Sequence, residues 1–288
     1  MSNANLSILA RQDPSRIVYE PFPYLHSEEA LEPALYQELA DAYPSLAQLV
    51  GDKAAENNRL FNVSAHKVVD DPAYPEIWRA FFAYHCSQAY LDEVKAFWGR
   101  GIEQEYPELA SWIGKPLSGL TCARRSAGKA KSDANRAADV MLDTQFAVNT
   151  PVVEPNSVRV PHLDNPWKLF ASLVYFRMPG DESTGGDLVL YRLRGSRFHH
   201  DAQMNVPERF LEPIHTVPYQ ANTLIMWVNT ERSFHGVTPR SVTPLPRRYI
   251  NFVGECYNLT TGGFFPKRRT LAGQSLSAMR RLVGARDL

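Results

Sequence analysis

Two histidines and one aspartate, spaced so that they could share a metal ion, are the residues of this chain best suited to chemistry. His162 and Asp164 are two positions apart, and His235 follows much later. Alternate side chains of extended backbone point the same way, so His162 and Asp164 can contact one ion. Two imidazoles and one carboxylate form the facial triad that holds non-heme Fe(II) and leaves coordination positions open. The pattern predicts an iron site at His162, Asp164 and His235.

A second His-x-Asp match, within His199-His200-Asp201, shows that the motif alone is weak evidence. This match lies in a polar stretch shortly before His235, and we interpret it as part of a loop. The first match ends a strand-like run, residues 158–162, and precedes the apolar run 169–175. A site needs rigid elements on both sides, which favours the first match. Zinc accepts the same ligands, but a zinc hydrolase would not need the arginines that follow His235.

The elements that must position these residues change in character along the chain. The first third is mostly helical: a helix capped by Ser27 that ends before Pro44, a second helix over residues 74–98, and a short one over 103–113. From about residue 117, short β-like runs are broken by Gly, Pro, Asn and Asp. The expected strands are residues 117–123, 141–149, 158–162, 169–177, 187–191, 214–219, 223–228 and 248–257. Their number and spacing favour a jelly roll or small barrel over βαβ units.

These elements indicate one integrated domain with three regions. We expect a helical support region in residues 1–115, a catalytic core in 116–262, and a basic tail in 263–288 that is helical over 271–282. Residues 124–138 are polar and poor in strand-forming residues. A mobile lid over the iron and an ordinary surface loop are equally good interpretations of this segment.

Composition limits the partners that this protein needs. The 288 residues include 31 basic and 31 acidic side chains, so no net field argues for nucleic acid or an anionic membrane as a partner. The first residues lack the layout of a signal peptide, and no apolar run is long enough to span a bilayer. The three cysteines are widely spaced and form neither a disulfide framework nor a thiolate metal site. We therefore expect a cytoplasmic protein.

Five segments of the chain, taken together, resemble the Fe(II)/2-oxoglutarate-dependent oxygenases of the prolyl-hydroxylase-like group. They are His162-Leu163-Asp164-Asn165-Pro166, Leu173-Val174-Tyr175-Phe176, Gly185-Gly186-Asp187-Leu188, Phe234-His235-Gly236-Val237-x-Pro239 and Arg248-Tyr249. The resemblance covers residues 141–257, and the motifs are specific only in combination. It implies an α+β, mainly β fold: a double-stranded β-helix, or jelly roll, buttressed by the N-terminal helices. It also implies Fe(II), 2-oxoglutarate as cosubstrate, and O2.

The resemblance also assigns roles by position. His162, Asp164 and His235 would bind iron, Arg248 would pair with the distal carboxylate of 2-oxoglutarate, and Tyr175 would contact the cosubstrate or be a core aromatic residue. Strand alternation places Arg248 on one face with Ile250 and Phe252, and we expect this face to point inward. A guanidinium there would suit a buried carboxylate. Arg247 and Arg240 are expected to face solvent.

The remaining expectations concern the reaction. Asp164 occupies the position at which halogenases of this type carry a small residue, so hydroxylation or a related oxidation such as desaturation is the expected outcome. Candidate substrate-binding residues, each of which could equally be structural, are Gln145, Asn149, Arg159, Asn165 and Trp167. We favour a small-molecule substrate such as an amino acid, a sugar or a natural-product intermediate. The alternative is a cupin-like metal-dependent isomerase or binding protein, which would have no use for Arg248.

Overall fold

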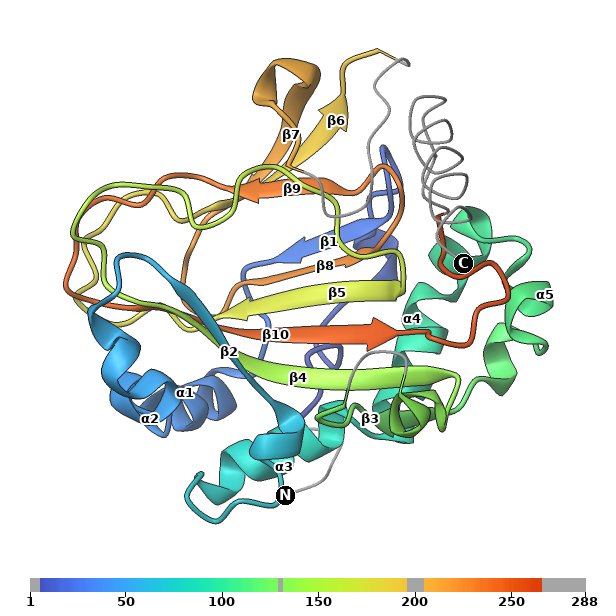
Figure 1. The fold of residues 1–288 in the computed structure, drawn as a ribbon, viewed down its shortest axis with the longest axis horizontal. Helices are drawn as coiled ribbons and strands as arrows, with labels where there is room; N and C mark the ends of the chain where they lie inside the picture. The colour runs from blue at the N-terminus through green and yellow to red at the C-terminus, as the bar shows by residue number, and fades with distance from the viewer. Residues whose placement is uncertain (1–5, 129–131, 196–204, 266–288) are drawn as a thin grey trace, which may run out of the picture.

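A computed structural model describes residues 6–128, 132–195 and 205–265 (Figure 1). In this part of the chain the α-helices are α1 (Pro33–Asp41), α2 (Leu46–Val50), α3 (Glu76–His85), α4 (Gln88–Glu105) and α5 (Leu109–Ile113). Side-chain caps explain where two of them begin. The hydroxyls of Ser45 and Ser87 accept hydrogen bonds from backbone amides in the first turns of α2 and α4.

The helix boundaries differ from the sequence-based expectation, and the helix expected over residues 103–113 is the end of α4 followed by the separate helix α5. Ser27 does not cap a helix, because it is the last residue of a strand, and α1 begins at Pro33 behind a cap by the Glu32 carboxylate. The backbone before α1 instead donates hydrogen bonds to Asn222. The long helix expected over residues 74–98 is two helices in the structure. The first, α3, ends at His85, and α4 begins behind the N-cap residue Ser87.

The larger sheet has seven strands. Its spatial order is β1 (Tyr24–Ser27), β8 (Leu224–Val228), β5 (Lys168–Tyr175), β10 (Arg247–Glu255), β4 (Val140–Asn149) and β2 (Leu60–Ser64), and β3 (Cys122–Arg124) lies beside β4. Only the β3–β4 pair is parallel. The register places Tyr249 of β10 between Ala147 of β4 and Tyr175 of β5. β10 is therefore a central strand of this sheet.

The smaller sheet is formed by β7 (Leu211–Val217), β6 (Leu188–Leu193) and β9 (Phe234–Val237), in that order. His162 extends it by an isolated bridge to His235, with reciprocal backbone hydrogen bonds of 2.9 and 3.1 Å. From β4 onward the chain alternates between the two sheets. His162, β6, β7 and β9 belong to the smaller sheet, and β5, β8 and β10, which separate them along the chain, belong to the larger sheet. This alternation gives a jelly-roll-like sandwich (Figure 1).

The two faces of the larger sheet bury different clusters. The outer face packs against the helices: the rings of Phe146 and Phe252 contact Trp78, Phe81 and Phe82 of α3, and Ile250 belongs to the same buried cluster. The inner face joins the smaller sheet through Ala147, Leu173, Tyr175, Trp227, Tyr249, Leu188 and Leu190. Both faces of β10 are therefore buried, one under helices and one inside the sandwich.

Several other expectations need correction. The first third contributes β1 and β2 to the larger sheet as well as helices, and in the expected strand 158–162 only His162 pairs. Residues 124–138 are not structureless, since they include the end of β3 and a 3-10 turn at Asp133–Arg136 whose Asn135 is fully buried. The expected tail helix lies outside the described residues. No helix within them is long and apolar enough to cross a membrane.

Candidate metal centre

His162, Asp164 and His235 lie together, as their spacing predicted. One ligand atom from each residue lies within 4.8 Å of the others. Nε2 of His235 is 3.9 Å from Oδ2 of Asp164, and the two imidazole rings are 4.4 Å apart between centroids. The backbone bridge between His162 and His235 creates this proximity, because it holds the smaller sheet's edge against the His-Leu-Asp segment. Two nitrogen donors and one oxygen donor thus converge on a single point.

Backbone contacts orient both imidazoles for metal binding. Nδ1 of His162 lies 2.9 Å from the carbonyl oxygen of Val160, and Nδ1 of His235 lies 2.9 Å from that of Ser233. A carbonyl can only accept, so each Nδ1 carries the proton and each Nε2 keeps its lone pair. Burial lowers the pKa of His162 to about 3, with a further contribution from nearby His235, and burial also lowers the pKa of His235. Both rings are therefore neutral, as a metal ligand must be.

Asp164 is ionised in spite of its burial. Burial by itself would raise the pKa of this carboxyl, but the positive charge of Lys168, the largest of the opposing contributions, holds the pKa well below its ordinary value. Nζ of Lys168 is 3.0 Å from Oδ1 of Asp164. Metal binding requires the deprotonated carboxylate, and this environment supplies it.

The arginine that points into the sandwich is Arg247 and not Arg248. Only 2% of Arg247 is exposed. Its Nε donates to the carbonyl oxygen of Gly186 at 2.8 Å, and its Nη2 donates to the Tyr175 hydroxyl at 3.1 Å. The guanidinium also lies within 5.0 Å of the ring centroids of Tyr175, Tyr219 and Tyr249. The expectation that Arg247 faces solvent is wrong.

Arg248 and Arg240 have other contacts. Arg248 does share a face with Ile250 and Phe252, but this face is the outer one, where its guanidinium lies 4.5 Å from the ring centroid of Tyr43. Arg240 is 1% exposed and forms a 2.7 Å ion pair with buried Asp181, so it does not face solvent either. The alternation of side chains correctly predicted which residues of β10 share a face. It did not predict which of the two faces points into the sandwich.

Arg247 is buried without an acidic partner in the described part of the chain. Its Nη1 lies 3.5 Å from Oδ1 of Asn149, and Nδ2 of Asn149 is buried without a hydrogen-bond partner among the described residues. Burial raises the pKa of Tyr175 to about 12, so its hydroxyl stays protonated. An unpaired buried guanidinium is costly. Arg247, Tyr175 and Asn149 therefore form a cradle suited to a small anion.

The other candidate substrate residues divide into two groups. Asn165 and Trp167 have structural contacts: the Asn165 side chain accepts from two backbone amides and donates to Glu255, and the Trp167 indole donates to the carbonyl of Gly262. Gln145 is partly exposed and Arg159 is exposed. Nε of exposed Arg159 donates to Nε2 of His162 at 3.0 Å, the lone pair that a metal would take.

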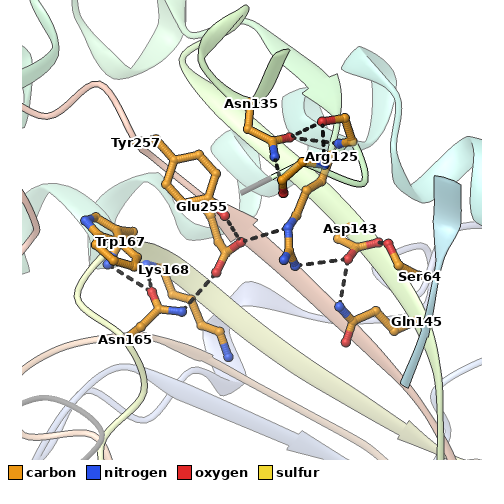
Figure 2. A network of polar contacts seen from close by, with 12 residues as sticks. Ser64, Arg125, Asn135, Asp143, Gln145, Asn165, Trp167, Lys168, Glu255 and Tyr257 are labelled. Carbon is orange, nitrogen blue, oxygen red and sulfur yellow. Dashed lines mark hydrogen bonds and ion pairs between the residues drawn. The ribbon is translucent and has the colours of Figure 1, made fainter. Parts of the chain in front are cut away.

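Gln145 belongs to a polar network on the inner face of β4 and β10 (Figure 2). Its amide donates to Asp143 at 2.7 Å and accepts from Asn251 at 3.0 Å. Arg125 spans the network, 3.3 Å from Asp143 and 3.7 Å from Glu255. Glu255 in turn accepts a hydrogen bond from Asn165, next to Asp164. A polar network thus extends along the sheet from Asn165, the residue that follows Asp164.

The roles of two residues, Arg247 and Lys168, were not predicted by the sequence analysis. Arg247 was noted but assigned to solvent, although the polar series Arg247, Tyr249 and Asn251 could have indicated a polar interior face. Lys168 was not noted, and its place four residues after Asp164 gives no signal outside a helix. The second match, His199 to Asp201, lies outside the described residues.

Comparison with known proteins yields only distant structural similarity. No protein-family model matches the chain, and no curated protein matches its sequence. A prolyl-4-hydroxylase from Pseudomonas putida is 14% identical, with 89% of this chain and 99% of that chain covered and a TM-score of 0.41. The α-ketoglutarate-dependent carbocyclase SnoK from nogalamycin biosynthesis is 12% identical, with 93% and 91% covered and a TM-score of 0.42. Such scores do not establish a function, which must be argued from the site.

Proposed function

We propose that this protein is an Fe(II)- and 2-oxoglutarate-dependent oxygenase that hydroxylates, or otherwise oxidises, a C–H bond of a small molecule, with release of succinate and CO2. The jelly-roll-like sandwich would then be the double-stranded β-helix of that class. The observation that carries the proposal is the pairing of two features in one interior. Three side chains that could bind a metal converge where the His235 ring lies against Trp227, and a buried arginine without an acidic partner among the described residues projects from β10 between the two sheets.

The three ligands fit iron by their chemistry. The Nε2 atoms of His162 and His235 and Oδ2 of Asp164 would hold the ion, and this donor set leaves positions open for other ligands. When bound, iron with 2-oxoglutarate and O2 supplies the oxidising power that breaks an unactivated C–H bond. The protein's part is to orient the ligands, position the substrate and exclude competing water.

Arg247 takes the role that the resemblance assigned to Arg248. A planar guanidinium recognises a carboxylate through two parallel hydrogen bonds, and a dicarboxylate could reach from the metal to this group. The Tyr175 hydroxyl, 3.1 Å from Nη2 of Arg247, would donate to the same carboxylate, and the free Nδ2 of Asn149 offers a further donor. The cosubstrate's negative charge would offset the cost of burying Arg247.

The polar network around Gln145 supports a small polar substrate. Asp143, Gln145, Asn251 and Arg125 present donors and acceptors on the inner face, beside the turn that holds Asp164. Arg159, at the metal ligand His162, is a further candidate for substrate contact. A ligand with several hydroxyl, amine or carboxyl groups would find partners there.

Anaerobic titration tests this proposal directly. Purified metal-free protein receives Fe(II) and then 2-oxoglutarate, and a weak metal-to-ligand charge-transfer absorption band should develop with both but with neither alone. Succinate release stimulated by members of a metabolite library would then identify the substrate class. Metal binding without the band at saturating 2-oxoglutarate would overturn the oxygenase proposal and favour a cupin-like isomerase or binding protein.

A further inference from the structure

The two oxygens of the Asp164 carboxylate have different neighbours. Oδ1 lies 3.0 Å from the ammonium nitrogen of Lys168, whereas Oδ2 lies 3.9 Å from Nε2 of His235. Both side chains are largely buried, with 16% of Lys168 and 13% of Asp164 exposed. Lys168 donates a charge-assisted hydrogen bond to Oδ1, and such a bond is stronger than one between neutral groups. Oδ1 is thus bound to Lys168, and Oδ2 faces His235.

A turn holds Lys168 in this position (Figure 2). The Asn165 side-chain oxygen accepts from the amides of Trp167 and Lys168 at 3.0 and 3.1 Å, and its Nδ2 donates to Glu255 of β10 at 3.0 Å. Nδ2 of Asn229 bonds to the carbonyl oxygens of both Asn165 and Lys168 at 3.0 Å. The backbone that carries the lysine is therefore anchored to β10 and to the residue that follows β8, which fixes the position from which its side chain reaches Asp164.

We propose that Lys168 is a positioning residue that occupies Oδ1 of Asp164, so that this carboxylate offers a metal only Oδ2. The inference rests on the proposed function, in that it takes the His162–Asp164–His235 group as the metal site. A six-coordinate ion held by one oxygen and two nitrogens keeps about three open positions. A carboxylate that chelates with both oxygens would remove one of them. Lys168 thus preserves room for a chelating cosubstrate together with O2.

The direct test counts water molecules on the bound metal. Mn(II) replaces iron, and the relaxation rate of water protons or 17O hyperfine spectroscopy gives the number of exchangeable waters. Wild type should keep about three, Lys168→Met about one fewer, and Lys168→Arg, which retains a donor for Oδ1, the wild-type number. If Lys168→Met does not fold, Lys168→Ala replaces it, since it also lacks a donor for Oδ1.

Cosubstrate affinity provides the second measurement. In Lys168→Met the Kd of Mn(II) should stay the same or fall, because a neighbouring cation is removed, while the Kd of 2-oxoglutarate should rise ~10-fold or more. A general loss of structure would instead weaken both. Lys115→Met is the matched control: Nζ of Lys115 lies 2.9 Å from Oδ2 of Asp139 in a similar ion pair away from the site, and neither Kd should change.

Several outcomes would overturn the inference. They are a wild-type Mn(II) ion that already has only about two waters, an unchanged water number in Lys168→Met, or a parallel loss of metal affinity. Failure of the proposed function looks different. If the water number falls in Lys168→Met but wild type shows no charge-transfer band with 2-oxoglutarate, Lys168 still positions Asp164 and the oxygenase proposal is wrong.

Discussion

Two neighbouring arginines of β10 have opposite environments, and this difference decides how the interior could bind an anion. Arg247 points between the two sheets, where the Tyr175 hydroxyl and the Gly186 carbonyl are its partners. Arg248 points to the helix-covered side, where it donates to the carbonyl of Phe176 and lies over the Tyr43 ring. Only Arg247 can reach a ligand inside the sandwich.

Replacement of Arg247 should therefore weaken cosubstrate binding without weakening metal binding. We expect Arg247→Ala to raise the Kd of 2-oxoglutarate ~30-fold or more, since loss of a buried, hydrogen-bonded charge pair costs about 2 kcal/mol or more. Anaerobic titration of the charge-transfer band measures this Kd. Arg247→Lys should recover part of the affinity, because the charge remains but the planar fork does not.

Arg248→Ala is the matched control for that experiment. It removes the same side chain one position along β10, and it should leave the 2-oxoglutarate Kd near the wild-type value. The assignment is wrong if Arg248→Ala weakens the cosubstrate more than Arg247→Ala does. Mn(II) affinity should be close to wild type in both variants, because neither arginine contacts the three metal-binding side chains.

At the scale of elements, the approach of β9 to the segment before His162 sets the geometry of the metal centre. Gly236 follows His235, and a Cβ atom there would lie 2.9 Å from the nitrogen and 3.0 Å from the Cα of Pro161. Glycine therefore permits the close contact that lets His162 and His235 exchange backbone hydrogen bonds. A larger residue would force the two histidine-bearing segments apart.

Gly236→Ala should weaken both the fold and metal binding. We expect about 1–3 kcal/mol less free energy of unfolding, as for overpacked interiors, and a Kd for Mn(II) raised ~10-fold or more. Urea denaturation and Mn(II) titration measure these effects. Gly99→Ala in α4 is the control, because its new methyl group would meet nothing nearer than 3.8 Å, and helical alanine is favoured over glycine. Unchanged metal affinity in Gly236→Ala would refute this account of the centre.

The packing of α3 under the N-terminal segment predicts a pH dependence of stability. His85 is fully buried, with Nδ1 2.8 Å from the Phe81 carbonyl and Nε2 accepting from the amide of Ile8 at 3.3 Å. Burial lowers the pKa of His85 to about 3, from an ordinary value of 6.5. As the pH falls below 6.5 the unfolded chain takes up this proton first, so the free energy of unfolding should fall with pH between about 6.5 and 3.

A substitution isolates this contribution. Between pH 7.5 and 5.5 the free energy of unfolding should fall by about 1.4 kcal/mol more in the wild type than in His85→Gln. This is the free energy that corresponds to one pH unit below the pKa of a histidine in the unfolded chain. Urea denaturation in metal-free buffer at both pH values measures the difference. Other buried histidines contribute equally to both proteins. An identical pH dependence in the two would contradict the assignment to His85.

At the scale of the whole molecule, the metal centre should couple ligand binding to global stability. His162 and His235 belong to the smaller sheet, whereas Asp164 lies in the segment that leads into β5 of the larger sheet, so one ion would link the smaller sheet to that segment. Mn(II) at a hundred times its Kd should stabilise the folded state by about 2.7 kcal/mol, seen as a raised Tm. Asp164→Ala should lose this shift, and Asp70→Ala, which removes an exposed carboxylate elsewhere, should keep it. An equal shift in Asp164→Ala would place the metal elsewhere.

Local sequence was sufficient for those features that depend on neighbouring residues. The two-residue spacing of His162 and Asp164, the series of short β-like runs, and the alternation of side chains along β10 could all be read directly. The convergence of His235 with them also followed from the order of the motifs. Because strand periodicity and turn residues act over a few positions, the mainly β, jelly-roll-like class was predictable from the sequence.

Only the tertiary structure decided which buried face is the interior of the site. Ile250 and Phe252 suggested an inward face for Arg248, but they pack under α3, while the polar series of Arg247, Tyr249 and Asn251 lies between the sheets. A central strand covered on both faces carries apolar residues on each, so hydrophobicity cannot distinguish a helix-covered face from a sandwich interior. The contact of Lys168 with Asp164 depends on a turn anchored by Asn229 and Glu255, far away in sequence, and no local pattern encodes it.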